Sequence, residues 1–184
     1  MIRQLPNAIT ASRGALGPVV MYVVVVLHHD LLAFWLFLFA ICTDLVDGWV
    51  ARRLNATSRA ALFLDPLADK LLTDFAWAAL AWVGHAPVSL AVLMIVRDLA
   101  IGVAWAMARS RAGAWSPRPL GQIAVAFEGT GLCVLLFHGP WLGIHWPSVG
   151  TFLGWLSLGL SLVALSEYSR PSPSGPREGA EAPP

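Results

Sequence analysis

The sequence predicts an all-α protein, an integral membrane bundle of six transmembrane helices with a short amino-terminal interfacial helix. The chain of 184 residues is 57% hydrophobic and only 12% charged, which is typical of membrane proteins. Its basic residues gather in alternate loops. Its apolar residues form runs of roughly the 20 residues that a helix needs to cross a bilayer. These runs are residues 14–28, 31–53, 60–83, 87–108, 119–138 and 146–167.

The arginines predict the orientation of the bundle, because Lys and Arg collect in cytoplasmic loops. The loops around residues 28–30, 84–86 and 138–145 contain neither. We therefore expect a multi-pass protein of the cytoplasmic (inner) membrane with both termini in the cytoplasm. The net charge of +1 excludes a strongly basic nucleic-acid-binding protein. The basic residues at the ends of the runs are Arg3, Arg13, Arg52, Arg53, Arg59, Arg109, Arg111, Arg118, Arg170 and Arg177.

Both ends of the chain differ from the apolar runs. Residues 3–13 are too polar to span a membrane, and their apolar residues suit a short interfacial helix. Residues 169–184 are rich in Pro, Ser, Gly, Glu and Ala and cannot bury enough surface to order themselves. We interpret residues 1–168 as one transmembrane domain and 169–184 as a disordered cytoplasmic tail.

Aspartates inside the second and third runs indicate a function. An aspartate at the centre of a membrane helix costs about 2.5 to 3.5 kcal/mol. Residues spaced by three or four lie on one face of a helix, and two such stripes stand at the expected cytoplasmic ends of these runs. One stripe is Asp44, Asp47, Gly48, Ala51 and Arg52, and the other is Ala61, Asp65 and Asp69.

We expect the two stripes to meet in the cytoplasmic half of the bundle, where four carboxylates repel one another unless they are protonated or bind cations. Hard oxygen ligands suit Mg²⁺, Mn²⁺ or Ca²⁺ better than zinc, so the sequence predicts a divalent, paired metal site. Such sites serve phosphoryl chemistry. Matching cations are too scarce for the alternative, carboxylates paired with basic residues at helix ends. The small residues of the stripes leave room for a flat ligand or a neighbouring helix.

The stretch from Asp44 to Asp69 resembles the signature of CDP-alcohol phosphotransferases, DxxDGxxAR, eight residues, then GxxxDxxxD. Every specified position matches except Ala61, where the family has glycine beside the nucleotide. The expected six-helix topology agrees with the family fold. The amino-terminal segment is similar to that of phosphatidylglycerophosphate and cardiolipin synthases within the family, through Pro6, Asn7, Thr10 and Arg13.

The resemblance implies an enzyme of phospholipid biosynthesis that transfers a phosphatidyl group from CDP-diacylglycerol to an alcohol and releases CMP. It implies two divalent cations, Mg²⁺ or Mn²⁺, on Asp44, Asp47 and Asp65, with Asp69 as the catalytic base that also touches a metal. It also implies a homodimer among membrane lipids. The residues expected at the donor are Asn7, Thr10, Gly48, Ala51, Arg52 and Ala61.

The acceptor is expected to contact Lys70, Arg97 and Arg118. Two of these residues have an alternative role. Lys70 could instead offset an aspartate of its own helix, and Arg97 could instead form a buried ion pair. Gln122 replaces a lysine of the similar subfamilies and removes a phosphate contact. Glycerol 3-phosphate is the preferred acceptor, with phosphatidylglycerol, as in cardiolipin synthases, or an inositol-type alcohol as alternatives.

Two further interpretations come from other classes. A divalent-cation transporter also places acidic residues on neighbouring helices, but a carrier needs a path to both faces, and the far half of the bundle offers no comparable acidic path. A catalytically inactive relative is suggested only by Ala61 and Gln122, and the intact aspartates oppose it. The GxxxG pair Gly150 and Gly154 is expected to pack against another helix of the same chain.

Overall fold

The computed structural model describes residues 5–54, 61–109, 119–137, 139 and 143–168, and describes side chains within 14–43, 67–104, 119–137, 139 and 143–165. Across these ranges the secondary structure is helical and contains no strand. Each of the six predicted apolar runs corresponds to one helix, so the predicted all-helical class and the positions of these runs are confirmed. The tail predicted at residues 169–184 lies outside the described residues. The helices are α1 (Leu5–Val25), α2 (Asp30–Leu54), α3 (Ala61–Trp82), α4 (Val88–Arg109), α5 (Pro119–Phe137) and α6 (Trp146–Tyr168).

The amino-terminal segment differs from the prediction. α1 runs unbroken from Leu5 to Val25 and includes Pro18, so the expected interfacial helix is the beginning of α1 rather than a separate element. The reason is local. Pro6 stands in the first turn, where its missing N–H removes no intrahelical hydrogen bond, and no other proline precedes Pro18 to end the helix.

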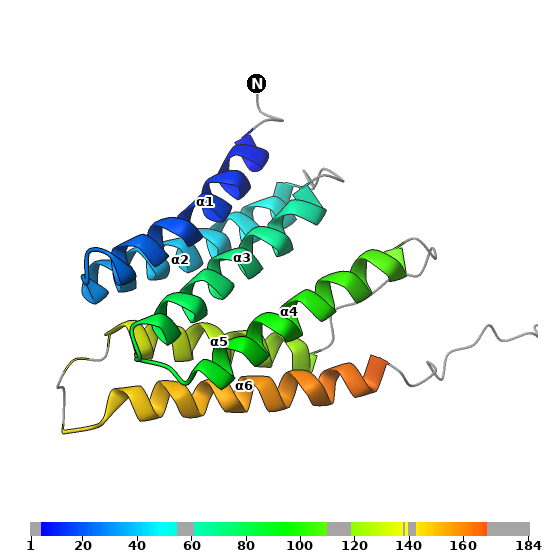
Figure 1. Cartoon of the computed structure of the whole chain (residues 1–184). Helices are drawn as coiled ribbons and strands as arrows, with labels where there is room; N and C mark the ends of the chain where they lie inside the picture. The colour runs from blue at the N-terminus through cyan, green and yellow to red at the C-terminus, as the bar shows by residue number, and fades with distance from the viewer. Residues whose placement is uncertain (1–4, 55–60, 110–118, 138, 140–142, 169–184) are drawn as a thin grey trace, which may run out of the picture.

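The helices form a bundle in which α3 holds a central place. α3 packs against α1, α4 and α5, while α2 packs against α1 and α5, and α6 packs against α5 and α4. The amino end of α1, the carboxyl end of α2 and the amino end of α3 point to the same side of the bundle (Figure 1). The carboxyl end of α4 points that way too. We call this side the motif end.

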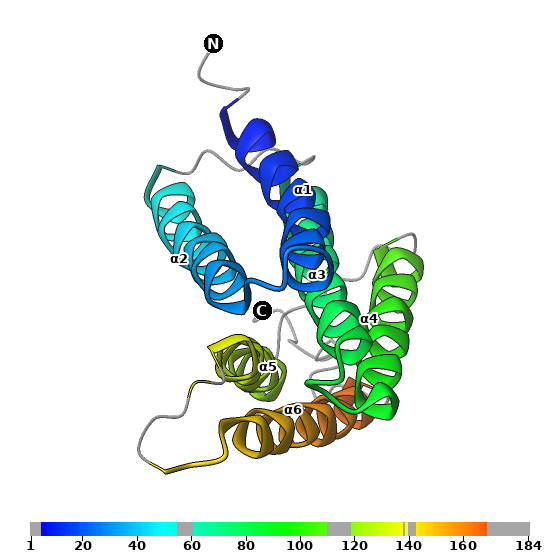
Figure 2. The same ribbon diagram turned by 60° about the vertical axis from the view of Figure 1, so that its left-hand side comes forward.

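Small residues allow the helices to approach closely. A Cβ atom added to Gly150 would lie 2.6 Å from Leu135 Cγ, and one added to Gly154 would lie 2.8 Å from Trp77 Cη2. The predicted packing of this glycine pair against helices of the same chain is therefore confirmed. The view in Figure 2 shows α5 and α6 side by side at this contact. Trp77 itself is completely buried at the centre of the core.

The outer surface is unusually apolar. Trp82 is 76% exposed, Phe39 is 66% exposed and Phe152 is 65% exposed, among many other large apolar side chains, whereas a soluble monomer rarely shows extended apolar patches. Within the described residues, Pro119–Phe137 and Trp146–Leu165 are long and apolar enough to cross a membrane. These features indicate a membrane protein, and the six-span topology stays a prediction.

Candidate active site

The signature residues divide between two helices that meet the same end of the bundle. Asp44 and Asp47 lie in the carboxyl-terminal part of α2, and Asp65 and Asp69 lie in the amino-terminal part of α3. Both helices reach the motif end (Figure 1), and both pack against α1. The fold thus brings the backbones of both halves of the signature to one side of the molecule.

The side chains of the signature are only partly described. Those of Asp44, Asp47 and Asp65 lie outside the described side chains, as do those of the expected donor-binding residues. Asp69 is half-buried on α3 and takes part in an interaction. Within the described side chains no group of three or more His, Cys, Asp or Glu residues could hold a metal ion, so convergence of the four carboxylates stays a prediction. The donor-binding residues with undescribed side chains are Asn7, Thr10, Gly48, Ala51, Arg52 and Ala61.

A second group of ionised side chains lies where α3, α4 and α5 meet. We call Lys70, Arg97, Asp98 and Glu128 the charge cluster. Lys70 Nζ lies 2.7 Å from Asp98 Oδ1 and 3.8 Å from Glu128 Oε2. Arg97, Asp98 and Glu128 are all buried. The cluster contains two cations and two carboxylates, which compensate one another inside the bundle, and the carboxyl group of Asp74 interacts electrostatically with all four.

Arg97 contributes every nitrogen of its guanidinium to contacts within the protein. Nε donates to Asp98 Oδ1 at 2.8 Å, and Nη2 donates to Glu128 Oε2 at 2.6 Å. Nη1 donates to Ser157 Oγ of α6 at 3.4 Å. The buried ion pair that the sequence left open therefore exists, and its partners are Asp98 and Glu128. Acceptor binding by Arg97 stays a prediction.

The other expected acceptor-binding residues occupy different surroundings. Lys70 forms an ion pair with Asp98 of α4 and also attracts the carboxyl group of Asp74 on its own helix, and its side chain remains 28% exposed. Arg118 lies outside the described residues, and Gln122 is exposed near the start of α5.

Sequence reasoning missed the residues that complete the charge cluster. Glu128 Oε1 accepts a hydrogen bond from Trp77 Nε1 at 3.3 Å, and Ser157 Oγ donates to the backbone oxygen of Ala124 at 2.8 Å. A glutamate within an apolar run was the available signal. Its partners could not be assigned, because helical spacing relates residues only within one helix.

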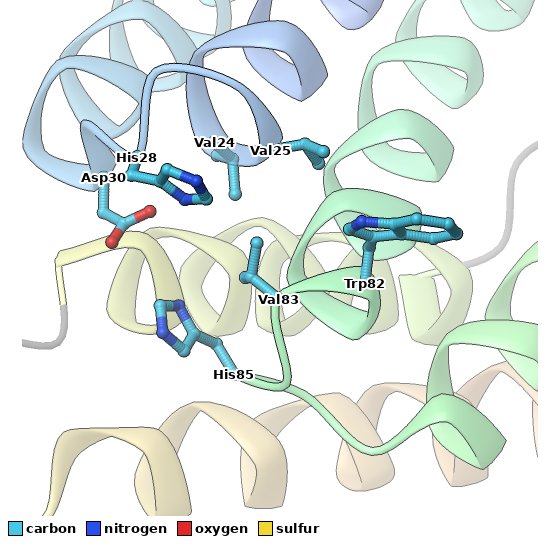
Figure 3. Close-up of a pocket in the computed structure, with 7 residues that line it drawn as sticks. All are labelled: Val24, Val25, His28, Asp30, Trp82, Val83 and His85. Atoms are coloured by element: carbon cyan, nitrogen blue, oxygen red, sulfur yellow. The ribbon is translucent and has the colours of Figure 1, made fainter.

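A pocket of about 420 Å³ lies at the opposite end of the bundle, between the connections of α1 to α2 and of α3 to α4. His28, Asp30 and His85 face it together with apolar side chains (Figure 3). Asp30 and Asp44 are separated by roughly 21 Å along α2, at about 1.5 Å per residue. His28 and His85 are therefore remote from the signature.

Known proteins resemble the chain over most of its length. The sequence model of the family described as CDP-alcohol phosphatidyltransferase matches residues 3–163. A protein of Bacillus subtilis named CDP-diacylglycerol–glycerol-3-phosphate 3-phosphatidyltransferase is 30% identical, covering 89% of this chain and 92% of its own length. A Pseudomonas fluorescens protein of the same name is 29% identical, covering 90% and 88%.

Cardiolipin synthases share a shorter region. The human cardiolipin synthase (CMP-forming) is 36% identical over 52% of this chain and 32% of its own length. The family match and the extent of the first relative establish that this chain belongs to the CDP-alcohol phosphatidyltransferase family and is a transferase enzyme of phospholipid biosynthesis.

Proposed function

We propose that the protein transfers a phosphatidyl group from CDP-diacylglycerol to glycerol 3-phosphate, with two divalent cations bound between α2 and α3. The observation that carries this proposal is the signature itself, since the fold delivers Asp44, Asp47, Asp65 and Asp69 to one end of the bundle on two helices. The full-length relatives named above support the choice of acceptor.

The donor set fits a hard divalent cation. All four candidate ligands are carboxylates, which suit Mg²⁺ or Mn²⁺ and match no thiolate- or imidazole-preferring metal. In contrast to the charge cluster, this group contains no cation of its own. When bound, the two cations neutralise the diphosphate of the donor and stabilise charge on the leaving group.

Asp69 is proposed as the general base. Its carboxylate takes the proton of the acceptor hydroxyl, whose oxygen then attacks the phosphorus that carries the diacylglycerol. The new phosphorus–oxygen bond forms as the bond to the CMP oxygen breaks, so the products are a phosphatidyl ester, CMP and one proton. Asp69 lies on α3, two turns from its amino end, and this position supports a base near the depth expected for a lipid diphosphate at the membrane interface.

The donor is proposed to lie along α1 and α2. Asn7, Thr10, Gly48 and Arg52 belong to helices whose adjacent ends face the motif end. The small Gly48 and Ala51 are proposed to leave the width that a cytidine ring needs, and Ala61 adds one methyl group beside it. Arg52 supplies a cation for the diphosphate.

The proposed orientation places the motif end in the cytoplasm. The loops at that end carry the arginines, and the loops at the other end contain neither Lys nor Arg. The outward-facing apolar side chains support a bundle that is surrounded by lipid along all six helices. Residues 1–168 would form this domain, and the family resemblance favours a homodimer.

The acceptor is tested by product analysis. Purified protein in detergent is given CDP-diacylglycerol, Mg²⁺ or Mn²⁺, and labelled glycerol 3-phosphate, phosphatidylglycerol or an inositol phosphate in separate reactions. We expect label from glycerol 3-phosphate to enter phosphatidylglycerophosphate. Product with phosphatidylglycerol alone would instead establish a cardiolipin synthase. CMP release without any of these acceptors being consumed would contradict all three assignments.

A further inference from the structure

The charge cluster connects the proposed base to three other helices. We propose that Asp98 is a positioning residue for the transfer reaction: its ion pair with Lys70 fixes the rotation of α3 and thereby the place of the Asp69 carboxylate. This inference rests on the proposed function, in which Asp69 is the base.

The pair itself is well anchored. Lys70 Nζ of α3 and Asp98 Oδ1 of α4 are 2.7 Å apart, and the Asp98 side chain is 1% exposed. The same Oδ1 accepts from Arg97 Nε, while Oδ2 has no hydrogen-bond partner among the described residues. Lys70 is thus one of the two residues that satisfy a buried carboxylate, and leaving such a group under-satisfied is costly. Arg97 is held in turn by Glu128 of α5.

A second connection lies further along α3 on the same face. Trp77 Nε1 donates to Glu128 Oε1 at 3.3 Å. Lys70 and Trp77 are seven residues apart, and this spacing returns to the same face of a helix. Two fixed points along one face oppose rotation of α3 about its axis.

The opposite side of α3 is fixed by α1. The Cα atom of Gly17 approaches the α3 backbone so closely that an added Cβ would lie 3.2 Å from the backbone oxygen of Leu71 and 3.3 Å from Leu72 Cα. Asp69 directly precedes Lys70, so the two positions differ by about 100° around the helix. Rotation of α3 would therefore displace Asp69 sideways, between the face held by α1 and the face held by the cluster.

The geometry favours positioning over phosphate binding for this cluster. All three guanidinium nitrogens of Arg97 already contact protein side chains. An acceptor phosphate at Lys70 would lie beside the carboxylates of Asp98 and Glu128, which are within 3.8 Å of the ammonium. Like charges at such distances repel strongly where water is excluded.

The test compares four proteins: Asp98→Asn, Lys70→Met, the double variant Lys70→Met/Asp98→Asn, and Lys70→Arg. The double variant keeps the cluster charge-balanced, so it is expected to fold even where a single variant does not, and thermal unfolding in detergent checks each protein. We expect kcat to fall on the order of 10- to 100-fold in Asp98→Asn and Lys70→Met, because small displacements of a catalytic group have such effects. KM for donor and acceptor should change little.

The pattern across the four variants separates the two roles. The kcat of the double variant should be no lower than that of the single variants, since both substitutions remove the same ion pair. Lys70→Arg should retain most of the wild-type kcat. A raised KM for the acceptor with unchanged kcat would overturn the proposal and make Lys70 an acceptor ligand. Unchanged kcat and KM in folded Asp98→Asn would also overturn it.

A second readout does not depend on activity. Asp69→Cys is made in a background in which the two free cysteines, Cys42 and Cys133, are replaced by serine. We expect Asp98→Asn to change the reaction rate of the introduced thiol with a water-soluble maleimide by about twofold or more, since access and thiolate character set that rate. The thiol of Ser89→Cys, at an exposed position of α4, serves as the matched control and should react unchanged.

The two hypotheses fail separately. A wild-type protein that releases no CMP contradicts the proposed function, while the thiol measurement still decides whether Asp98 fixes α3. An active wild-type protein whose introduced thiol reacts at the same rate with and without Asp98→Asn contradicts the positioning role alone.

Discussion

The molecule contains two groups of ionisable side chains within its helices, and they are composed differently. The charge cluster combines Lys70 and Arg97 with two carboxylates, and its members contact one another at distances down to 2.6 Å. The signature group combines carboxylates alone, Asp44, Asp47, Asp65 and Asp69. The two groups adjoin on α3, since Asp69 and Lys70 are consecutive residues of this helix.

The difference shows two solutions to one physical problem. A charge removed from water requires a partner. The charge cluster finds its partners within the chain, so it stabilises and orients helices. The signature group has too few internal cations and is proposed to receive its partners as divalent metal ions, so it binds substrate phosphates. Substitutions in the signature group should therefore lower activity with little loss of stability. Substitutions in the charge cluster should lower stability, and should lower activity only through the position of Asp69.

The largest effect is expected in the signature group. Asp69→Asn should lower the rate of CMP release by about 10²- to 10⁴-fold, the range for loss of a general base. Thermal unfolding should occur at an equal or higher temperature, because the change removes one repelling carboxylate. A rate within a few-fold of wild type, measured on folded protein, would exclude Asp69 as the base.

In the charge cluster, the main expected effect of a substitution is a loss of stability. Glu128→Gln leaves Arg97 without one of its buried carboxylates and should lower the free energy of unfolding by about 3–5 kcal/mol. Denaturation in detergent measures this. Gln122→Ala on the same helix is the control, and at this exposed position it should change stability by less than about 0.5 kcal/mol. Equal stability of Glu128→Gln and Gln122→Ala would disprove the structural role of the cluster.

A smaller loss is expected where α1 meets α3, the contact that holds the other side of α3. An added Cβ at Gly17 would lie 2.8 Å from Phe75 Cδ2 and would press on the α3 backbone, so Gly17→Ala should destabilise by about 1–3 kcal/mol. Gly102→Ala in α4 meets nothing within 4 Å and is the matched control. Similar unfolding temperatures for both variants would show that this contact is not tight.

The smallest effect is expected from completing the signature. Ala61→Gly removes the methyl group that distinguishes this chain from the family pattern. If that methyl enters the cytidine site, the change should lower KM for CDP-diacylglycerol by up to about tenfold, the low end of the range for one carbon in a pocket. Steady-state kinetics at saturating acceptor measure this. A raised donor KM would indicate that Ala61 packs against a neighbouring helix instead.

The sequence predicted the helices and the close contacts of Gly150 and Gly154, because long apolar runs and small-residue pairs follow directly from bilayer thickness and helix geometry. It did not predict an unbroken α1, because polarity indicated a separate element where the backbone continues as a helix. It also did not predict the partners of Lys70 and Arg97. Spacing along α3 suggested an aspartate of the same helix for Lys70, and it does not reveal Asp98 and Glu128, which α4 and α5 bring in.

The candidate site was also predicted from the sequence only in part. The identity of the four aspartates came from the spacing of the signature. The backbones of α2 and α3 carry them to one end of the bundle, and the convergence of their carboxylates stays a prediction. Trp77 lies in the core and donates a hydrogen bond to Glu128, a contact between α3 and α5 that the sequence did not predict. Contacts between helices decide such positions, and the sequence of one helix does not contain them.

The most direct test of the central claim is metal-dependent release of CMP from CDP-diacylglycerol with glycerol 3-phosphate as acceptor. We predict that the purified protein releases CMP in Mg²⁺ or Mn²⁺, that EDTA abolishes this release, and that returning either cation restores it. CMP release that continues at the same rate in EDTA, or its absence in a folded protein supplied with both cations, would contradict the account.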